Sequence, residues 1–241
     1  MLIADLARVT VPVPPPARAA TEWWSTRDPG AWPAPPAGDG RPAMLIPGFL
    51  AGDLSLRRMS TWLQSGGFVC APSGMRWNVD CMERVAQTLE ARLEEAVERE
   101  GQRALIVGQS RGGTLGRVLA VRRPDLVDTL VALGSPVADQ LAVRPQVWLS
   151  IGAVGGLGTL GVPGLFSSSC RNGSCCAGAR QQLAEPFPDA VRFVAVYSRR
   201  DEVVKWEACL DPAAAQVEVE TTHIGMGLDA TVWARVAAAL A

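Results

Sequence analysis

The sequence predicts an α/β fold, in which a mostly parallel sheet is covered by helices on both faces. Two observations indicate it. Short runs of apolar residues alternate along the chain with longer segments of helical periodicity. The apolar runs are continuous rather than alternating, which is typical of strands that are buried on both faces of a sheet.

Each element of this fold has a local signal. The expected strands are the apolar runs at residues 43–46, 68–71, 104–107, 127–133, 191–197 and 217–221. The expected helices lie over residues 53–65, 80–100, 112–123 and 230–240. The second helix is the clearest, because Val85, Leu89 and Leu93 recur on one helical face. The third ends before Pro124, which cannot continue a helix.

The N-terminal segment has a different composition. Residues 10–42 are rich in proline and also contain three tryptophans. Because proline interrupts helices and interior strands, we predict an extended arm whose tryptophans pack on the domain surface. A disordered tail is the alternative, but such tails seldom carry three tryptophans. We therefore divide the chain into an arm at residues 1–42 and one domain at residues 43–241.

A long insertion, about residues 137–188, separates the fourth and fifth expected strands. Residues 145–170 within it carry no charge. The segment 147–166 is long and apolar enough to suggest a membrane span, but its glycines and Pro163 weaken a lone helix. The α/β pattern also resumes intact after it. We therefore expect no membrane span and an apolar cap, with residues 147–166 lining a pocket.

The composition excludes some kinds of partner. The chain of 241 residues has a formal net charge of −1, so there is no electrostatic case for binding nucleic acid or an anionic membrane. The first residues lack a basic leader, and their apolar run is broken by Asp5 and Arg8. No signal peptide is predicted, and a cytoplasmic location is expected.

Six cysteines allow three interpretations. One group is clustered and the other is dispersed: Cys170, Cys175 and Cys176 in the first, Cys70, Cys81 and Cys209 in the second. They could be reduced thiols, which are usual in a cytosolic protein, or a disulfide could pin the loop at residues 170–176, with Cys209 as one candidate partner. A zinc site is the third interpretation. The Cys-x4-Cys-Cys spacing is unusual for zinc, and the single histidine of the chain is assigned below to catalysis. We therefore predict no metal and no cofactor.

The clearest chemical signal is a nucleophile motif. Gly108-Gln109-Ser110-Arg111-Gly112 has the form G-x-S-x-G, between an expected buried strand and an expected helix. In that position a tight turn projects the serine hydroxyl above the sheet edge and directs the next backbone N–H toward the reacting oxygen. A glycine-rich turn with a helix-capping serine is the alternative interpretation of Ser110.

A serine nucleophile needs a base and an acid. His223 is the only histidine of the chain, and Asp201 lies between it and Ser110 in sequence. Both follow expected strands, and open α/β sheets place their sites at the carboxyl ends of strands. Asp201 would orient the imidazole, which would accept the serine proton. An exposed loop histidine and a surface ion pair are the alternatives, with Glu202 and Asp139 as substitute acids.

Acyl transfer also needs donors to the developing oxyanion. Pro47-Gly48-Phe49-Leu50 follows the first expected strand, where one donor should lie. We assign the N–H groups of Phe49 and Arg111 to this role. A plain Pro-Gly turn is the alternative interpretation of the first segment.

Together these motifs resemble a known family. Residues 45–49, 108–113, 200–204 and 222–223 look like the corresponding segments of the α/β-hydrolase superfamily, in its bacterial lipase/esterase-like branch. The resemblance covers roughly residues 42–241. It departs from the family at Pro47, where many lipases have histidine. The short front end also implies that the first strands of the family sheet are missing or replaced by the arm.

The resemblance implies a role for each candidate residue. It makes Ser110 the nucleophile, Asp201 the acid and His223 the base, with Phe49 and Arg111 at the oxyanion hole. The leading hypothesis is a serine carboxylester hydrolase that cleaves small apolar esters through an acyl-enzyme. An acyltransferase, thioesterase or cyclase would use the same triad. A non-catalytic binding module on a hydrolase scaffold is the third possibility, since this fold carries many functions.

Overall fold

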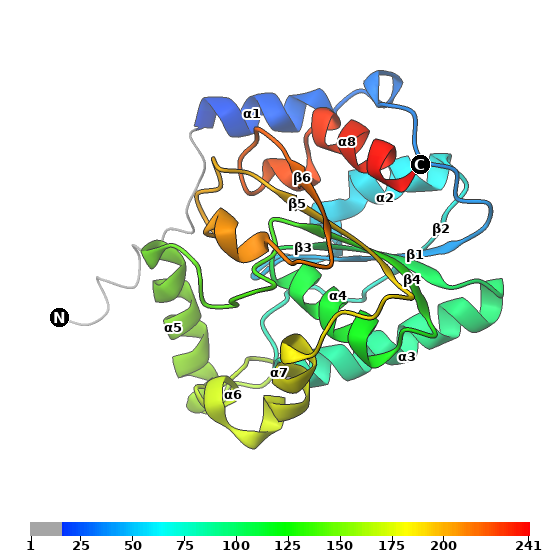
Figure 1. The fold of residues 1–241 in the computed structure, drawn as a ribbon. Coiled ribbons are helices and arrows are strands. Elements are labelled where there is room, and N and C mark those ends of the chain that lie inside the picture. Colours follow the sequence, from blue (N-terminus) through cyan, green and yellow to red (C-terminus); the bar gives the residue numbers. More distant parts are fainter. Residues whose placement is uncertain (1–15) are drawn as a thin grey trace.

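The computed structural model of the protein describes residues 16–241. Within this range the chain forms one six-stranded sheet in the order β2-β1-β3-β4-β5-β6 (Figure 1). The strands are β1 (Pro42–Ile46), β2 (Val69–Pro72), β3 (Ala104–Gln109), β4 (Val127–Leu133), β5 (Arg192–Tyr197) and β6 (Ala215–Glu218). Each pair of neighbours is parallel. The predicted α/β class with a mostly parallel sheet is confirmed.

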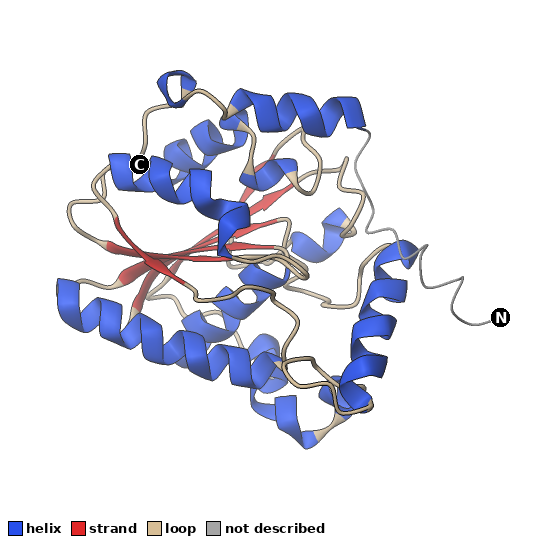
Figure 2. Cartoon of the chain, turned by 180° about the vertical axis from the view of Figure 1, so that it is seen from behind, coloured by secondary structure: helices blue, strands red, loops and turns tan. Residues whose placement is uncertain are grey.

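Helices cover both faces of the sheet, as Figure 2 shows. They are α2 (Arg57–Ser65), α3 (Met82–Glu100), α4 (Arg111–Arg122) and α8 (Ala230–Leu240). Successive side chains of a strand point to opposite faces. In β1, Ala43 and Leu45 belong to the core beneath α2 and α8. Met44 and Ile46 belong to the core beneath α3 and α4. Because both faces are covered, the strands are continuously apolar.

The expected elements are present, with shifted boundaries. The helix expected over residues 53–65 begins as a 3-10 turn, Asp53–Leu56, before α2. The larger difference is the last strand, which we expected over residues 217–221 and which ends at Glu218. The Val219 N–H still donates to the carbonyl of Tyr197 at 2.9 Å. Beyond it the chain leaves the sheet and bonds to the N-terminal helix.

The prediction of a helix-free N-terminal arm is wrong for Pro16–Ser25, which forms helix α1. Proline disrupts a helix only in its interior, and Pro16 occupies the first helical position, where its missing N–H costs nothing. The next proline is Pro29, after the helix has ended. Residues 16–41 form no strand, so within the described chain the first strand is β1 and this part of the arm does not replace a strand. The part of the expected arm before Pro16 lies outside the described residues.

The tryptophans of the N-terminal segment divide into two kinds. Trp32 packs edge to face on the buried Trp233 of α8, with ring centroids 5.5 Å apart. Trp23 and Trp24 are instead 42% and 62% exposed, and an arginine side chain covers each ring at 4.4 Å. The expectation that all three pack on the domain surface therefore holds fully for Trp32 alone.

The chain between β4 and β5 forms a separate helical group at one end of the sheet (Figure 1). It contains α5 (Pro145–Thr159), α6 (Ser169–Asn172), the 3-10 turn η4 (Ser174–Cys176) and α7 (Ala177–Ala184). In the described part of the chain, no helix combines the length and the apolar composition that a membrane crossing requires. The apolar segment around residues 147–166 is divided between α5 and an irregular return.

A buried arginine fixes the end of this group to the core. Arg117 of α4 pairs with Asp211 at 3.0 Å, and both side chains are almost fully buried. The same guanidinium donates to the carbonyls of Gln182, Leu183 and Glu185 at 3.0–3.1 Å. The last carbonyls of a helix have no partner within it. Arg117 supplies those partners for α7 and so holds it against α4.

We expect two glycines of α5 to respond oppositely to alanine. A Cβ at Gly158 would lie 2.1 Å from the Phe166 carbonyl oxygen, whereas a Cβ at Gly156 would contact nothing within 4 Å. Gly158→Ala should lower the free energy of unfolding by about 1–3 kcal/mol through overpacking. Gly156→Ala should leave it unchanged or raise it by up to about 1 kcal/mol, because alanine favours the helix. Urea denaturation of both variants measures this, and equal effects would contradict the close packing at Gly158.

Candidate active site

The candidate residues meet at the carboxyl edge of the sheet. Phe49 follows β1, Ser110 follows β3, Asp201 follows β5 and His223 follows β6. Because all strands are parallel, these loops emerge on the same side. Phe49, Ser110, Arg111 and His223 line one cavity of about 1430 Å³. Asp201 lies behind His223, away from the cavity.

Ser110 occupies a strained turn between β3 and α4. Its backbone has φ 53° and ψ −124°, a conformation that L-residues rarely adopt and that accumulates at functional sites. The Ser110 N–H donates to the carbonyl of Leu133 at 2.8 Å, which fixes the turn to β4. The start of α4 approaches β1 so closely that a Cβ at Gly112 would lie 2.0 Å from the Ile46 carbonyl oxygen. Only glycine at this position permits the tight turn.

Asp201 and His223 form a buried hydrogen-bonded pair. Nδ1 of His223 lies 2.7 Å from Oδ2 of Asp201, and the two residues are 6% and 3% exposed. The other carboxylate oxygen accepts the N–H groups of Val203 and Val204, both at 2.7 Å. These bonds hold the carboxylate in one orientation and stabilise its charge. The imidazole is thereby fixed, with Nε2 as the ring nitrogen left for another partner.

The two substitute acids occupy other positions. Asp139 is exposed at the rim of the cavity, where its carboxylate accepts the Leu141 N–H at 2.9 Å. Glu202 accepts the backbone N–H of His223 at 3.2 Å, and burial raises the pKa of its carboxyl group. Of the three acids considered, Asp201 is the one that contacts the imidazole.

A residue of the N-terminal helix also supports the histidine loop. The buried carboxylate of Glu22 accepts the backbone N–H of Thr222 and the hydroxyl of Thr221, both at 2.8 Å. It also accepts the Thr222 hydroxyl. On the other side, Nε2 of Gln109 donates to the carbonyl of His223 at 3.0 Å. Sequence reasoning missed Glu22, because a single glutamate in a proline-rich segment carries no pattern.

Two backbone segments offer amide donors beside Ser110. Arg111 is the first residue of α4, and the first amides of a helix have no acceptor within it. Phe49 lies in the turn after β1, which is held by the Asn78 side chain donating to the Pro47 carbonyl at 2.7 Å. The next residue, Leu50, has φ 61°, so this turn is strained as well. Both residues predicted for the oxyanion hole line the same cavity as Ser110.

The side chain of Arg111 does not enter the cavity as a free charge. Its guanidinium donates to the carbonyls of Asn78, at 3.3 Å, and Asp80. It also lies 5.5 Å from the ring centre of Phe166. Burial lowers the pKa of Arg111 to about 10, so the group stays protonated at neutral pH. It is a fixed cation beneath the apolar wall.

Comparisons with known proteins identify the fold through solved structures. No model of a protein family matches the sequence, and no curated protein is a match to it. Solved structures do match. The mature lipase BlEst2 of Bacillus licheniformis aligns with a TM-score of 0.58 at 13% identity, over 80% of this chain and 89% of that one. An alpha/beta hydrolase enzyme, MGS-MChE2, from the metagenome of Moroccan lagoon sediments, aligns with a TM-score of 0.55 at 17% identity, over 83% and 90%.

A third similar solved structure is a thioesterase rather than a lipase. The thioesterase domain from the curacin biosynthetic pathway aligns with a TM-score of 0.50 at 13% identity, over 85% of this chain and 92% of that domain. All three alignments cover most of both chains. This chain has the α/β-hydrolase fold. The resemblance inferred from the motifs is confirmed at the level of the fold.

In this α/β-hydrolase fold, the group between β4 and β5 forms the apolar wall of the cavity. Val147, Ile151 and Gly155 of α5 line it, together with Phe166, whose ring lies 6.0 Å from that of Phe49. Only one side of α5 takes part. Leu149 and Leu157 are 65% and 50% exposed and do not line the cavity. The expectation that the whole segment 147–166 lines the pocket is therefore corrected to one face of α5 and its return.

Proposed function

We propose that this protein is a serine hydrolase that cleaves apolar carboxylic esters through an acyl-enzyme on Ser110. One observation carries the proposal. A buried Asp201–His223 pair, hydrogen-bonded at 2.7 Å, opens onto the same cavity as a serine held at positive φ between a strand and a helix. This combination supports nucleophilic catalysis, in which a base fixed by an acid activates a serine.

The first half of the reaction forms the acyl-enzyme. Nε2 of His223 accepts the proton of the Ser110 hydroxyl as the oxygen attacks the ester carbonyl. The carbonyl oxygen gains negative charge, which the N–H groups of Phe49 and Arg111 stabilise by hydrogen bonding. Asp201 stabilises the imidazolium cation. His223 then gives its proton to the departing alcohol, and Ser110 keeps the acyl group.

The second half regenerates the enzyme. A water molecule loses a proton to Nε2 of His223 and attacks the acyl carbonyl from the cavity. The same two amides stabilise the second oxyanion. The imidazolium returns the proton to the Ser110 oxygen as the carboxylic acid leaves. No cofactor takes part in these steps.

The cavity wall supports an apolar acyl group as the substrate part bound near Ser110. Apolar side chains, among them Val147, Ile151 and Phe166, form most of the wall on α5 and its return, where Ser150 and Thr159 are polar members. Sugars and charged peptides would require more hydrogen-bond partners than this mostly apolar wall offers. Apolar chains gain free energy by leaving water for such a surface. We therefore favour esters of medium-length fatty acids.

Ser110→Ala and His223→Ala should each abolish turnover of p-nitrophenyl esters while leaving the fold intact. Because the residues act as a unit, the double variant should be little slower than either single one. In intact-mass spectrometry, a p-nitrophenyl phosphonate should add one adduct to the wild type and none to Ser110→Ala. Near-normal turnover by His223→Ala would end the proposal, because the chain has no second histidine.

The same assay separates the alternative functions. Release of free acid shows hydrolysis, whereas preferential formation of a new ester from an added alcohol would show an acyltransferase. Absence of both turnover and phosphonate labelling in folded wild-type protein would indicate a non-catalytic binding module.

Asp201→Asn should lower kcat by roughly 10,000-fold, because the amide cannot orient and stabilise the imidazolium as the carboxylate does. Asp139→Asn is the matched control, since Asp139 lies at the rim and contacts no part of His223, and its kcat should stay near that of the wild type. Circular dichroism checks that both variants fold. A normal Asp201→Asn enzyme beside an inactive Asp139→Asn enzyme would overturn the assignment of the acid.

The value of kcat/KM should rise with acyl chain length from acetate to medium-length esters. Each buried methylene contributes about 0.8 kcal/mol, or roughly three- to fourfold per carbon, until the pocket is full. Ile151→Asp should reduce this gain, because a carboxylate would enter the apolar wall. Its turnover of acetate should change much less, which also shows that the variant is folded.

Leu149→Asp is the control for this prediction. Leu149 lies on the same helix as Ile151 but is 65% exposed and directed away from the cavity. Its chain-length profile should match that of the wild type. A flat profile in the wild type, or equal profiles in both variants, would show that α5 does not contact the acyl group.

A further inference from the structure

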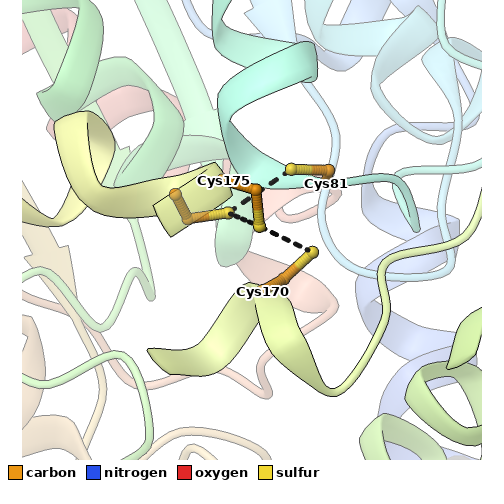
Figure 3. A group of neighbouring side chains, drawn as sticks. Cys81, Cys170 and Cys175 are labelled. Carbon is orange, nitrogen blue, oxygen red and sulfur yellow. Dashed lines mark hydrogen bonds between the residues drawn. The ribbon is translucent and has the colours of Figure 1, made fainter. Parts of the chain in front are cut away.

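Four of the six cysteines converge beside the cavity. The sulfur atoms of Cys81, Cys170, Cys175 and Cys176 all lie within 4.8 Å of one another. Figure 3 shows three of these side chains directed toward a common centre from different elements. Cys81 precedes α3, Cys170 lies in α6, and the other two lie in η4. Cys81 does not stand apart, as the sequence suggested, because α3 begins next to the group between β4 and β5.

Three of the sulfur separations lie close to those of a tetrahedral metal site. Cys81 and Cys176 are 3.4 Å apart, Cys170 and Cys175 are 3.6 Å apart, and Cys175 and Cys176 are 3.8 Å apart. With zinc–sulfur bonds of about 2.3 Å, the corners of a tetrahedron lie about 3.8 Å from each other. Four thiols thus surround a point at the correct distance for one ion, with little rearrangement.

We propose that these four cysteines bind one structural zinc ion. Four thiolates fill the tetrahedral coordination of zinc and leave no open position, so the ion would stabilise the fold rather than take part in catalysis. Soft sulfur ligands in this geometry favour zinc over magnesium, calcium or manganese. The proposal is independent of the hydrolase mechanism, because it uses none of the same side chains.

The surrounding charges suit such a site. Binding converts four thiols to thiolates with release of four protons to solvent, so the zinc centre carries a net charge of −2. Burial lowers the pKa of the Arg111 guanidinium, and negative charge on Cys176 and Cys81 would oppose that shift. Arg84 is exposed and already pairs with Asp80. Arg111 is therefore the buried cation that offsets part of the charge of the proposed centre.

The loop that carries three of the ligands is already held in place. Arg180 donates to the carbonyls of Cys170 at 3.3 Å and Gly173 at 2.7 Å, at two points of the loop. The carboxylate of Glu83, two residues after Cys81, accepts the N–H of Ala179 at 3.1 Å. Outer contacts of this kind orient the ligands of metal sites. The ligands therefore come from three elements that the metal would join, namely the start of α3, α6 and η4.

Disulfide pairing explains the arrangement less well. Two bridges would require two close pairs, but they would not require the pairs to meet each other. Here Cys175 is close to both Cys170 and Cys176, and all four sulfurs share one centre. Cys70 and Cys209 take no part in this group. Cys209 lies in a separate apolar cluster with Val143 and Val204.

The proposal is tested by metal analysis of the purified full-length protein. After dialysis without chelator, we expect one zinc ion per chain. Replacement by Co²⁺ should give the intense visible absorption and the sulfur-to-cobalt charge-transfer bands of tetrahedral thiolate coordination. Iron in place of zinc, or wild-type protein that binds neither Zn²⁺ nor Co²⁺ after full reduction, would overturn it. So would an intact mass that is lower by two hydrogens for each disulfide within the cluster.

Two variants make the test specific. Cys175→Ser changes the most exposed ligand, so the chain should still fold, and zinc affinity should fall by more than the about 10- to 100-fold typical of losing an outer-shell contact. Cys70→Ser is the control outside the cluster and should keep one zinc per chain. Chelation should lower the Tm of the wild type and of Cys70→Ser, but leave that of Cys175→Ser nearly unchanged. Equal zinc content in the two variants would contradict the proposed ligand set.

Discussion

The parallel alignment of the strands is the constraint on which the rest of this structure depends. After each strand the chain must return to the amino edge of the sheet before the next strand begins. Every loop that directly follows a strand therefore lies at the carboxyl edge. That edge gathers residues that are far apart in the sequence, such as Phe49, Ser110 and His223. The strained turn at Ser110 is held in place by β4, whose Leu133 carbonyl accepts the Ser110 N–H. The site is thus a property of the sheet rather than of any one loop.

The wall of the cavity is supported from its ends. Near its start, Val143 pairs with Val204, and the Arg144 N–H donates to the Val203 carbonyl at 2.8 Å, within the loop that carries Asp201. At its return, the Phe166 N–H donates to the Val79 carbonyl at 2.8 Å. Between these two attachments, α5 contacts the cavity with one face and solvent with the other. The start of α5 is therefore attached to the loop that carries Asp201.

Much of this fold could be predicted because its signals are local. The periodicity of α3 and the apolar runs of β3 and β4 each report burial of a contiguous segment. The G-x-S-x-G motif around Ser110 and the single histidine can likewise be recognised from the sequence alone. Asp201 was predictable from its position after a strand, and its hydrogen bond to His223 agrees with that position.

The features that escaped prediction depend on distant contacts. A proline-rich composition concealed α1, because composition averages over a segment and ignores which prolines stand at the helix start. Cys81 reaches its neighbours across 95 residues, and no spacing rule relates it to them. The end of β6 was misplaced because the threonines after it bond to α1 and not to the sheet. For Cys81 and for the end of β6, a tertiary contact decided an outcome that local pattern left open.

The attachment of Glu22 to the histidine loop has a consequence for the order of assembly. Its hydrogen bond to the Thr222 N–H joins residues separated by 200 positions. The free-energy cost of closing so long a loop is modest, because each doubling of loop length adds only about 0.6 kcal/mol. The delay during synthesis is the larger effect. As the chain emerges from its N-terminal side, α1 must wait for almost all of the sheet before its buried carboxylate finds a partner. The segment around Ser110 is therefore synthesised long before the loop of His223 can be attached to α1.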